Sequence, residues 1–299
     1  MKRFRNGWLS PTGVDRPACH HSGLRVDIQG LAPTLRDVSM SADSSSPFDR
    51  LQRPLNAGQR LVTLTAYDYP TARLVDEAGV DLVLVGDSLG MVFAGLPDTT
   101  GVTMEHMLYH TTVVARGVRQ ALLVADLPFR SYETPEETVR NGRRLIDAGA
   151  HAVKLEGGAE QLPQLEALRD AGIPTVGHIG MLPQHVLEEG GYKKKGKTSP
   201  EAERLVDSAR ALEAVGVGAI VLESIVPSVA KRITEAIHIP TIGIGSGPDC
   251  DGEIRVIHDV IGAFPWFVPP FAKPEADVAG NIRHAIAAYA AEVRGKKVG

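Results

Sequence analysis

Short apolar runs alternate with longer amphipathic segments along most of the chain. Seven runs are rich in branched aliphatic residues and a weaker eighth follows them; they cover residues 60–68, 81–87, 121–129, 152–158, 174–180, 219–224, 240–246 and 253–259. The segments between them, such as 134–150 and 199–217, carry apolar residues at three- and four-residue spacing and open with Thr or Ser followed by Pro, which is typical of a helix start. The pattern therefore predicts eight successive β/α units.

The ends of the amphipathic segments follow a common rule. Four glycines, Gly79, Gly149, Gly172 and Gly216, stand where a helix needs a left-handed residue to end. Eight β/α units in about 240 residues favour an α/β fold of the closed (β/α)8 TIM-barrel type over residues 57–299. A doubly wound open sheet is the alternative that counting units leaves open.

Residues 1–56 differ from the rest. They are rich in Ser, Pro, Arg and Gly without sustained apolar periodicity, which predicts a poorly ordered N-terminal extension. Either translation starts at Met40, or residues 1–40 are a mitochondrial transit peptide; the first reading predicts a cytoplasmic protein. Cys19, His20 and His21 are interpreted as an incidental cluster and not as a metal site.

Composition narrows the class of protein. The chain has 299 residues, 43% of them hydrophobic, and a formal charge of -4, so it can bury a large core. It has no apolar run of about 18 residues that would predict a membrane span. Two cysteines cannot build a disulfide framework, and the absence of a long basic stripe argues against nucleic-acid binding. Small molecules are the expected partners.

Polar residues interrupt the apolar runs where each predicted strand ends. Along the chain they are Asp87, Asp126, Lys154, Glu156, His178 and Glu223. The carboxyl ends of barrel strands meet at one mouth, so we expect these side chains to converge there. Four converging carboxylates need compensation, and oxygen ligands without a His/Cys cluster point to a hard cation, Mg²⁺.

Each of these residues also has an ordinary structural interpretation. A single Asp or Glu at a strand end is more often a helix N-cap or a loop hydrogen bond than a ligand. Lys154 could pair with Glu156 or bind an anionic substrate, and His178 could be a satisfied core histidine. The Gly- and Lys-rich segment 188–202 could be a solvated loop or a mobile lid. Segment 243–252 lacks the spacing of a nucleotide-binding loop.

A series of motifs carries a family resemblance. In order they are TAYDYPTA, DLVLVGDSLGMV, TMEHMLYHT, ADLPFRSY, AVKLEGG, GIPTVGHIGMLPQ, GGYKKKGKT, PTIGIGSGPDCDGE and HDVIG. In these motifs the chain resembles the 3-methyl-2-oxobutanoate hydroxymethyltransferase family, also called ketopantoate hydroxymethyltransferases. The resemblance covers residues 60–293, nearly all of the chain outside the N-terminal extension.

The resemblance implies an enzyme of pantothenate, hence coenzyme A, biosynthesis. Such an enzyme transfers a hydroxymethyl group from 5,10-methylenetetrahydrofolate to 3-methyl-2-oxobutanoate, giving 2-dehydropantoate, with one Mg²⁺ per subunit. It also implies a homo-oligomer, commonly a decamer of two pentameric rings.

The same resemblance assigns roles to individual residues. Asp87 and Asp126 match metal ligands, and Glu156 matches a residue that reaches the metal through water. Ser88, Lys154 and His178 match positions that hold the oxo acid beside the metal-bound Asp87 and Asp126. Glu223 matches the catalytic base.

Two rival functions stay open on the sequence. One is a Mg²⁺-dependent carbon–carbon lyase or mutase of the phosphoenolpyruvate mutase and isocitrate lyase kind, which the segments 66–68 and 95–98 partly resemble. Those enzymes need a second Asp just after the third strand, where this chain has Leu-Pro-Phe, and the lyases need a loop cysteine, which is absent between Cys19 and Cys250. The other is an inactive barrel that acts as a binding protein, which predicts loss of at least one strand-end residue.

Overall fold

The computed structural model describes residues 46–270 and 272–296 of the chain. Its eight strands form one closed barrel in which β1 to β8 follow in sequence order and β8 pairs with β1, all in parallel. The strands are β1 (Leu61–Thr65), β2 (Leu82–Val85), β3 (Leu122–Asp126), β4 (Ala152–Lys154), β5 (Thr175–Gly180), β6 (Ala219–Glu223), β7 (Thr241–Ile244) and β8 (Gly252–Arg255). The predicted TIM-type barrel is therefore confirmed, and the open sheet is excluded.

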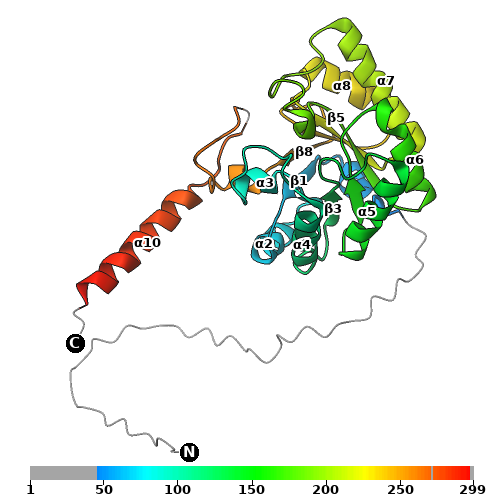
Figure 1. The fold of residues 1–299 in the computed structure, drawn as a ribbon. Coiled ribbons are helices and arrows are strands. Elements are labelled where there is room, and N and C mark those ends of the chain that lie inside the picture. Colours follow the sequence, from blue (N-terminus) through cyan, green and yellow to red (C-terminus); the bar gives the residue numbers. More distant parts are fainter. Residues whose placement is uncertain (1–45, 271, 297–299) are drawn as a thin grey trace, which may run out of the picture. The chain divides into compact units, whose positions relative to one another are not determined.

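Helices follow every strand except β7, which connects to β8 through residues 245–251 without a helix, so the expected seventh β/α unit lacks its helix (Figure 1). The α-helices are α1 (Asp49–Asn56), α2 (Tyr69–Glu77), α3 (Leu89–Val92), α4 (Met104–Ala115), α5 (Pro135–Asp147), α6 (Leu162–Asp170), α7 (Ser199–Val215), α8 (Pro227–Ala236), α9 (Ile257–Val260) and α10 (Val278–Gly295). Two 3₁₀ turns, η2 (Ala159–Gln161) and η3 (Pro183–His185), follow β4 and β5. No helix in the described ranges is long and apolar enough to cross a lipid bilayer.

Helix boundaries follow the sequence signals. Thr134 and Thr198 cap α5 and α7, because each side chain accepts a hydrogen bond from the backbone three residues on, and a Pro lies in the first turn of both helices. The four predicted glycine terminators all have left-handed backbones, with φ of 80°, 109°, 67° and 100° in chain order. Local chemistry therefore sets where these helices start and stop.

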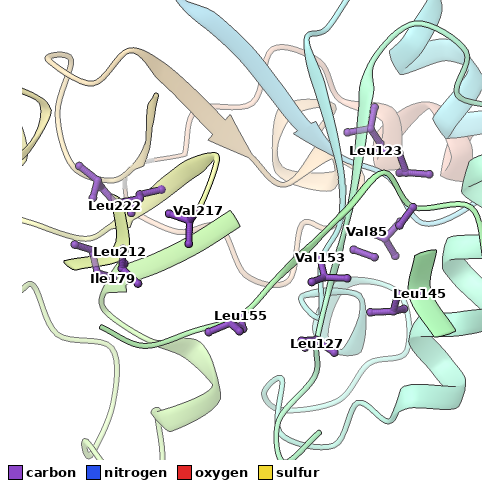
Figure 2. Close-up of a cluster of buried hydrophobic side chains, with 14 of the residues drawn as sticks. Val85, Leu123, Leu127, Leu145, Val153, Leu155, Ile179, Leu212, Val217 and Leu222 are labelled. Atoms are coloured by element: carbon purple, nitrogen blue, oxygen red, sulfur yellow. The ribbon is translucent and has the colours of Figure 1, made fainter. Parts of the chain in front are cut away.

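Two apolar layers hold the barrel together. Alternate strand residues, such as Leu82, Leu84 and Val124, fill the inside of the barrel. Those between them, such as Val83 and Val85, pack outward against the helices. Figure 2 shows part of this outer layer, including Val85, Leu123, Leu145, Val153 and Leu212. Strands buried on both faces explain why the sequence shows continuous apolar runs instead of alternation.

The structure differs from the sequence expectation over residues 49–56. These residues form helix α1, and Phe48 and Leu51 are buried against the residues inside the barrel. Arg50 donates a hydrogen bond to the Ala121 carbonyl just before β3, and Phe48 lies so close to Gly218 that any side chain there would collide with its ring. Helix α1 therefore closes the amino-terminal mouth of the barrel. The rest of the expected extension, with Cys19, His20, His21 and Met40, lies outside the described residues.

Candidate active site

The predicted strand-end residues gather at the carboxyl mouth of the barrel. They are Asp87 two residues after β2, Asp126 at the end of β3, Lys154 and Glu156 at and just after the end of β4, His178 on β5 and Glu223 at the end of β6. All are buried except Glu223, whose side chain is 14% exposed. The expectation that these residues converge is confirmed, although convergence does not by itself assign a role to any of them.

Asp126 joins the ends of three neighbouring strands. Strand register places it beside Lys154, and the Lys154 ammonium lies 2.8 Å from its Oδ1 atom. The backbone N–H of Asp87 donates to its other oxygen, Oδ2, at 3.1 Å. This one carboxylate therefore fixes the mutual positions of the β2, β3 and β4 ends.

His178 lies between two carboxylates. Its Nδ1 is 3.4 Å from Glu156 Oε1 and also 3.4 Å from Lys154 Nζ, while its Nε2 is 3.3 Å from Glu223 Oε2. Burial and the Lys154 ammonium oppose protonation, whereas Glu156 and Glu223 favour it, and the balance raises the pKa of His178 to about 9. The ring therefore has a carboxylate at each edge, and both carboxylates favour its protonated form.

The cluster holds more acidic than basic side chains. Four acidic side chains face two basic ones, Lys154 and His178. Burial raises the pKa of Asp87, and the charges of Asp126 and Glu156 raise it further. Burial likewise raises the pKa of Asp126, although Lys154 offsets part of that effect. A further cation would relieve the repulsion between these carboxylates.

The donor set fits a hard divalent ion held partly by water. Asp87, Asp126 and Glu156 offer only carboxylate oxygens, which Mg²⁺ prefers. Within residues 46–270 and 272–296, no three His, Cys, Asp or Glu side chains are arranged to enclose a metal by themselves. A Mg²⁺ ion held by one or two of these carboxylates would need water or substrate for its remaining ligands.

Ser88 lies next to the acidic cluster. Its hydroxyl is 2.8 Å from the hydroxyl of Tyr67, a buried residue just after β1 that sequence reasoning missed. A β-carbon at Gly86 would lie 2.9 Å from Ser88 Oγ and 3.6 Å from Asp126 Oδ2, so a glycine leaves room beside both oxygens. The close approach of the Gly86 backbone to Ser88 requires a glycine there, and the oxo-acid role of Ser88 stays a prediction.

Sequence reasoning also missed Tyr132 and Gln184. Both are buried, and the Tyr132 hydroxyl donates to Gln184 Oε1 at 2.5 Å. Gln184 belongs to the GMLPQ motif of the resemblance, but neither its charge nor a strand end marks it in the sequence. A neutral residue in a 3₁₀ turn gives no such signal.

The backbone after Glu223 is strained. Ser224 has a left-handed backbone with φ of 49°, which is uncommon for a residue with a side chain. Ser246, in the loop after β7, supports this turn: its hydroxyl donates to the Leu222 carbonyl at 2.7 Å and accepts from the Ile225 N–H at 3.0 Å. These two bonds flank Glu223 and help to fix its direction.

The Gly- and Lys-rich loop lies beside the end of β6. The Lys195 N–H donates to the Ser224 carbonyl at 2.8 Å, and the Lys195 side chain pairs with Glu189 at 2.6 Å. The Tyr192 hydroxyl lies 3.6 Å from Met91 Sδ, while its side chain remains half exposed. The loop is thus anchored at Lys195, and its movement as a lid stays a prediction.

Comparison with known proteins reveals close relatives. A family model described as "Ketopantoate hydroxymethyltransferase" matches residues 47–298. A protein of Pyrobaculum neutrophilum named 3-methyl-2-oxobutanoate hydroxymethyltransferase is 57% identical over 234 residues, or 78% of this chain and 89% of the relative. A protein of the same name from Nitratidesulfovibrio vulgaris is 51% identical over 244 residues, covering 81% and 80% of the two chains.

Solved structures with the same fold are more distant in sequence. A phosphonopyruvate hydrolase in complex with oxalate and Mg²⁺ has a TM-score of 0.59 at 15% identity, covering 83% of this chain and 88% of the other. A 2,3-dimethylmalate lyase of the phosphoenolpyruvate mutase and isocitrate lyase superfamily has a TM-score of 0.55 at 17% identity, covering 85% and 89%. At such identities the likeness extends to the fold alone.

The family model spans the whole barrel and more than half of the aligned residues are identical in the first of these relatives. The chain belongs to the ketopantoate hydroxymethyltransferase family and is an enzyme of that kind.

Proposed function

We propose that this enzyme transfers a hydroxymethyl group from 5,10-methylenetetrahydrofolate to 3-methyl-2-oxobutanoate, giving 2-dehydropantoate for pantothenate and coenzyme A synthesis. The observation that carries the proposal is the buried, net acidic cluster beside Lys154 and His178, with the partly exposed Glu223 at its edge. The names of the relatives support the choice of substrate.

Asp87 and Asp126 would hold a divalent cation, Mg²⁺ by the chemistry of their oxygens, and Glu156 would contact it through water. A bound Mg²⁺ supplies Lewis acidity that polarises the keto group of the oxo acid. The Oε1 atom of Glu156 lies 3.4 Å from Nδ1 of His178. This contact helps to hold the carboxylate in place, where it can also accept a hydrogen bond from a water molecule.

Lys154 and His178 would hold the anionic substrate. Burial opposes the charge of Lys154, yet Asp126, Glu156 and Asp87 together raise its pKa, so the ammonium persists at neutral pH. His178 is protonated as well. With both side chains charged and buried, Lys154 and His178 would attract the substrate carboxylate. They would also stabilise the enolate that forms when C3 is deprotonated. Ser88 would contribute a hydroxyl to the same ligand.

Glu223 would be the base that removes the proton from C3. It alone among the clustered carboxylates is partly exposed, and its Oε2 atom lies 3.3 Å from Nε2 of His178. One of the two C–N bonds of the folate methylene carbon breaks first, which makes that carbon an iminium carbon. The electron pair released at C3 then forms the new C–C bond while the C=N pair returns to nitrogen, and water replaces this second nitrogen to leave the hydroxymethyl group. The proton taken from C3 and one proton of the water balance the two protons that the folate nitrogens gain.

The test is an assay of purified enzyme with both substrates, with and without EDTA, together with exchange of the C3 proton in heavy water. We expect product formation that EDTA abolishes and added Mg²⁺ restores. Glu223→Gln should retain Mg²⁺ and oxo-acid binding but lose proton exchange; normal exchange in that variant would remove Glu223 from this role.

The lyase or mutase alternative is supported only by fold. The distant structures share the barrel at 15–17% identity, whereas the relatives at 51–57% bear the hydroxymethyltransferase name. Turnover of phosphonopyruvate or 2,3-dimethylmalate, with no product from the two proposed substrates, would reverse the assignment. An inactive binding barrel is disfavoured because every predicted strand-end residue is present.

Assembly and location remain part of the proposal. Ile282, Ile286, Tyr289 and Val293 recur on one side of α10 and are 48–69% exposed, an apolar face that favours self-association. A homo-oligomer, as large as a decamer, is the expected result of light scattering coupled to size exclusion. A cytoplasmic location rests on a start at Met40, which N-terminal sequencing of the native protein would test.

A further inference from the structure

Gln184 makes hydrogen bonds to two of the three buried carboxylates. Its side-chain Nε2 donates to Asp87 Oδ2 at 2.9 Å, and its backbone N–H donates to Glu156 Oε2 at 3.0 Å. The side chain is 1% exposed, so no water competes for these bonds. One residue of the 3₁₀ turn after β5 therefore reaches carboxylates that follow β2 and β4.

The amide of Gln184 is itself held in one orientation. Its second Nε2 hydrogen goes to the Leu127 carbonyl at 2.9 Å, and its Oε1 accepts from the Tyr132 hydroxyl at 2.5 Å. The Leu127 carbonyl and the Asp87 carboxylate can only accept, so they define which end of the amide is nitrogen. Every polar atom of the Gln184 side chain thus has a partner, and a flipped amide would lose the bonds to Asp87 and to the Leu127 carbonyl.

Gln184 contacts one oxygen of each carboxylate and leaves the second oxygen of each for other partners. Asp87 Oδ2 and Glu156 Oε2 are occupied by its N–H groups, while Asp87 Oδ1 is left to other partners and Glu156 Oε1 faces His178. Fixing one oxygen of a carboxylate fixes the direction of the other. The contacts also offset part of the repulsion among Asp87, Asp126 and Glu156, because each donated N–H stabilises an anion.

We propose that Gln184, oriented by Tyr132, is a positioning residue that presets Asp87 and Glu156 for the divalent cation. This inference rests on the proposed function, because it assumes that these carboxylates serve a metal. In this role Gln184 acts through its contacts to Asp87 and Glu156.

The decisive variant is Gln184→Met, which keeps the length and volume of the side chain but removes its donors. The backbone N–H to Glu156 remains, so the variant removes the side-chain bond to Asp87 together with the bonds to the Leu127 carbonyl and the Tyr132 hydroxyl that orient the amide. Loss of an outer contact of a metal ligand typically weakens metal binding by about 10- to 100-fold. We expect the Kd for Mn²⁺, measured by electron paramagnetic resonance and calorimetry on the substrate-free enzyme, to rise by about tenfold.

Activity at limiting and saturating metal separates positioning from general damage. In Gln184→Met, kcat should fall at limiting Mn²⁺ and recover most of its value when Mn²⁺ is raised about tenfold above the wild-type requirement. Tyr132→Phe should show the same pattern with a smaller shift, because the amide keeps its other contacts. Gln164→Met is the matched control: its amide contacts the Tyr132 and Glu133 carbonyls at 3.4 Å and no carboxylate of the cluster.

The possible results are distinct. If wild-type enzyme binds no divalent ion, the metal-dependent mechanism of the proposed function is wrong. If wild type binds Mn²⁺ and Gln184→Met binds it with unchanged Kd, the positioning role is overturned while the proposed function stands. A loss of kcat in Gln184→Met that excess Mn²⁺ does not restore also overturns it, since that result indicates general damage to the fold.

Discussion

The two mouths of the barrel are closed by opposite kinds of chemistry. At the amino-terminal mouth, α1 inserts Phe48 and Leu51 into the apolar residues that fill the barrel. At the carboxyl mouth, equally buried positions hold Asp87, Asp126 and Glu156. The strands are the same at both ends, so the difference teaches that one mouth serves stability and the other serves chemistry.

Burying side chains has opposite effects on the folding free energy at the two mouths. Burying a leucine side chain stabilises a fold by about 1.5–3 kcal/mol. Burying ionised carboxylates costs free energy unless partners compensate, and burial raises the pKa of Asp87 because its partners do not compensate fully. Substitutions at the carboxyl mouth should therefore separate activity from stability, and substitutions at the amino-terminal mouth should not.

The largest effect is expected from Asp87→Asn. Loss of a proposed metal ligand should lower kcat/KM by about 10³-fold, a magnitude typical of removing one electrostatic contact to the transition state. In EDTA the same variant should be more stable than wild type, with a free energy of unfolding about 1–2 kcal/mol higher, because the repulsion with Asp126 and Glu156 is gone. Urea unfolding and initial rates measure the two effects.

The control for this prediction is Asp207→Asn, at an exposed position on α7 with a side chain 74% exposed. It should leave kcat/KM unchanged and change the free energy of unfolding by no more than about 0.5 kcal/mol. A less stable Asp87→Asn protein in EDTA would contradict the view that the carboxyl mouth is strained by its charges.

The next largest effect is expected at the other mouth, from Leu51→Ala. This side chain is fully buried, and its truncation should lower the free energy of unfolding by about 2–4 kcal/mol through lost burial and a cavity. The kcat/KM of the protein that remains folded should stay within about twofold, because the cavity opens away from the charged cluster. Leu74→Ala, at a position 67% exposed on α2, should leave both quantities unchanged. A large loss of activity in folded Leu51→Ala protein would mean that the mouths are coupled.

The sequence predicted the charged mouth better than the apolar one, and the reason is physical. A carboxylate at the end of a buried run, such as Asp126, is conspicuous, and parallel strands bring such ends together. Around helix α1 the three apolar residues Phe48, Leu51 and Leu55 stand at three- and four-residue spacing, but this single repeat next to a long polar stretch is too short to predict a helix. Its structure depends on contacts with residues more than 60 positions away, such as Ala121, which local pattern cannot reveal.

The same argument explains the missed residues at the carboxyl mouth. Gln184 and Tyr132 carry no charge and lie in turns, and their importance comes from partners such as Asp87, 97 positions away from Gln184. Sequence periodicity predicts elements, and element order predicts which ends meet. Neither signal predicts which neutral side chain, such as Gln184, contacts residues on other loops of the same mouth.

A pH effect of intermediate size should arise near the amino-terminal mouth. His151, just before β4, accepts a hydrogen bond from the Leu123 N–H at its Nδ1 atom. Burial, with the nearby charge of Arg50 on α1, lowers its pKa to about 4. The unfolded chain therefore binds a proton that the folded protein refuses between about pH 6.5 and 4, and stability falls as the pH falls through that window.

The expected loss is about 2 kcal/mol, less than the full 1.36 kcal/mol per pKa unit because the ring is partly exposed. Comparing urea unfolding of wild type and His151→Asn at pH 7 and pH 4.5 measures it, since Asn can still accept the Leu123 bond but does not titrate. The fully exposed His238 gives the control variant His238→Asn. Equal acid sensitivity in wild type and His151→Asn would show that the titrating groups lie elsewhere.

The smallest effect is expected from Ser246→Ala at the carboxyl mouth. The hydroxyl satisfies the buried Ile225 N–H, and leaving that group without a partner costs about 1–2 kcal/mol. Because the two lost bonds flank Glu223, kcat should fall by about three- to tenfold while the Kd for Mn²⁺ stays unchanged. Ser246→Thr keeps the hydroxyl and should retain most of the activity if the added methyl group fits.

This pattern distinguishes two kinds of support within one mouth. Gln184 acts on the carboxylates proposed to hold the metal, whereas Ser246 acts on the turn that aims the proposed base. A drop in kcat that excess Mn²⁺ reverses belongs to the first kind, and one that it leaves untouched belongs to the second. If Ser246→Ala lost metal affinity instead, the β6 turn and the carboxylates of β2 to β4 would behave as one rigid unit, held together through the His178 contacts to Glu156 and Glu223.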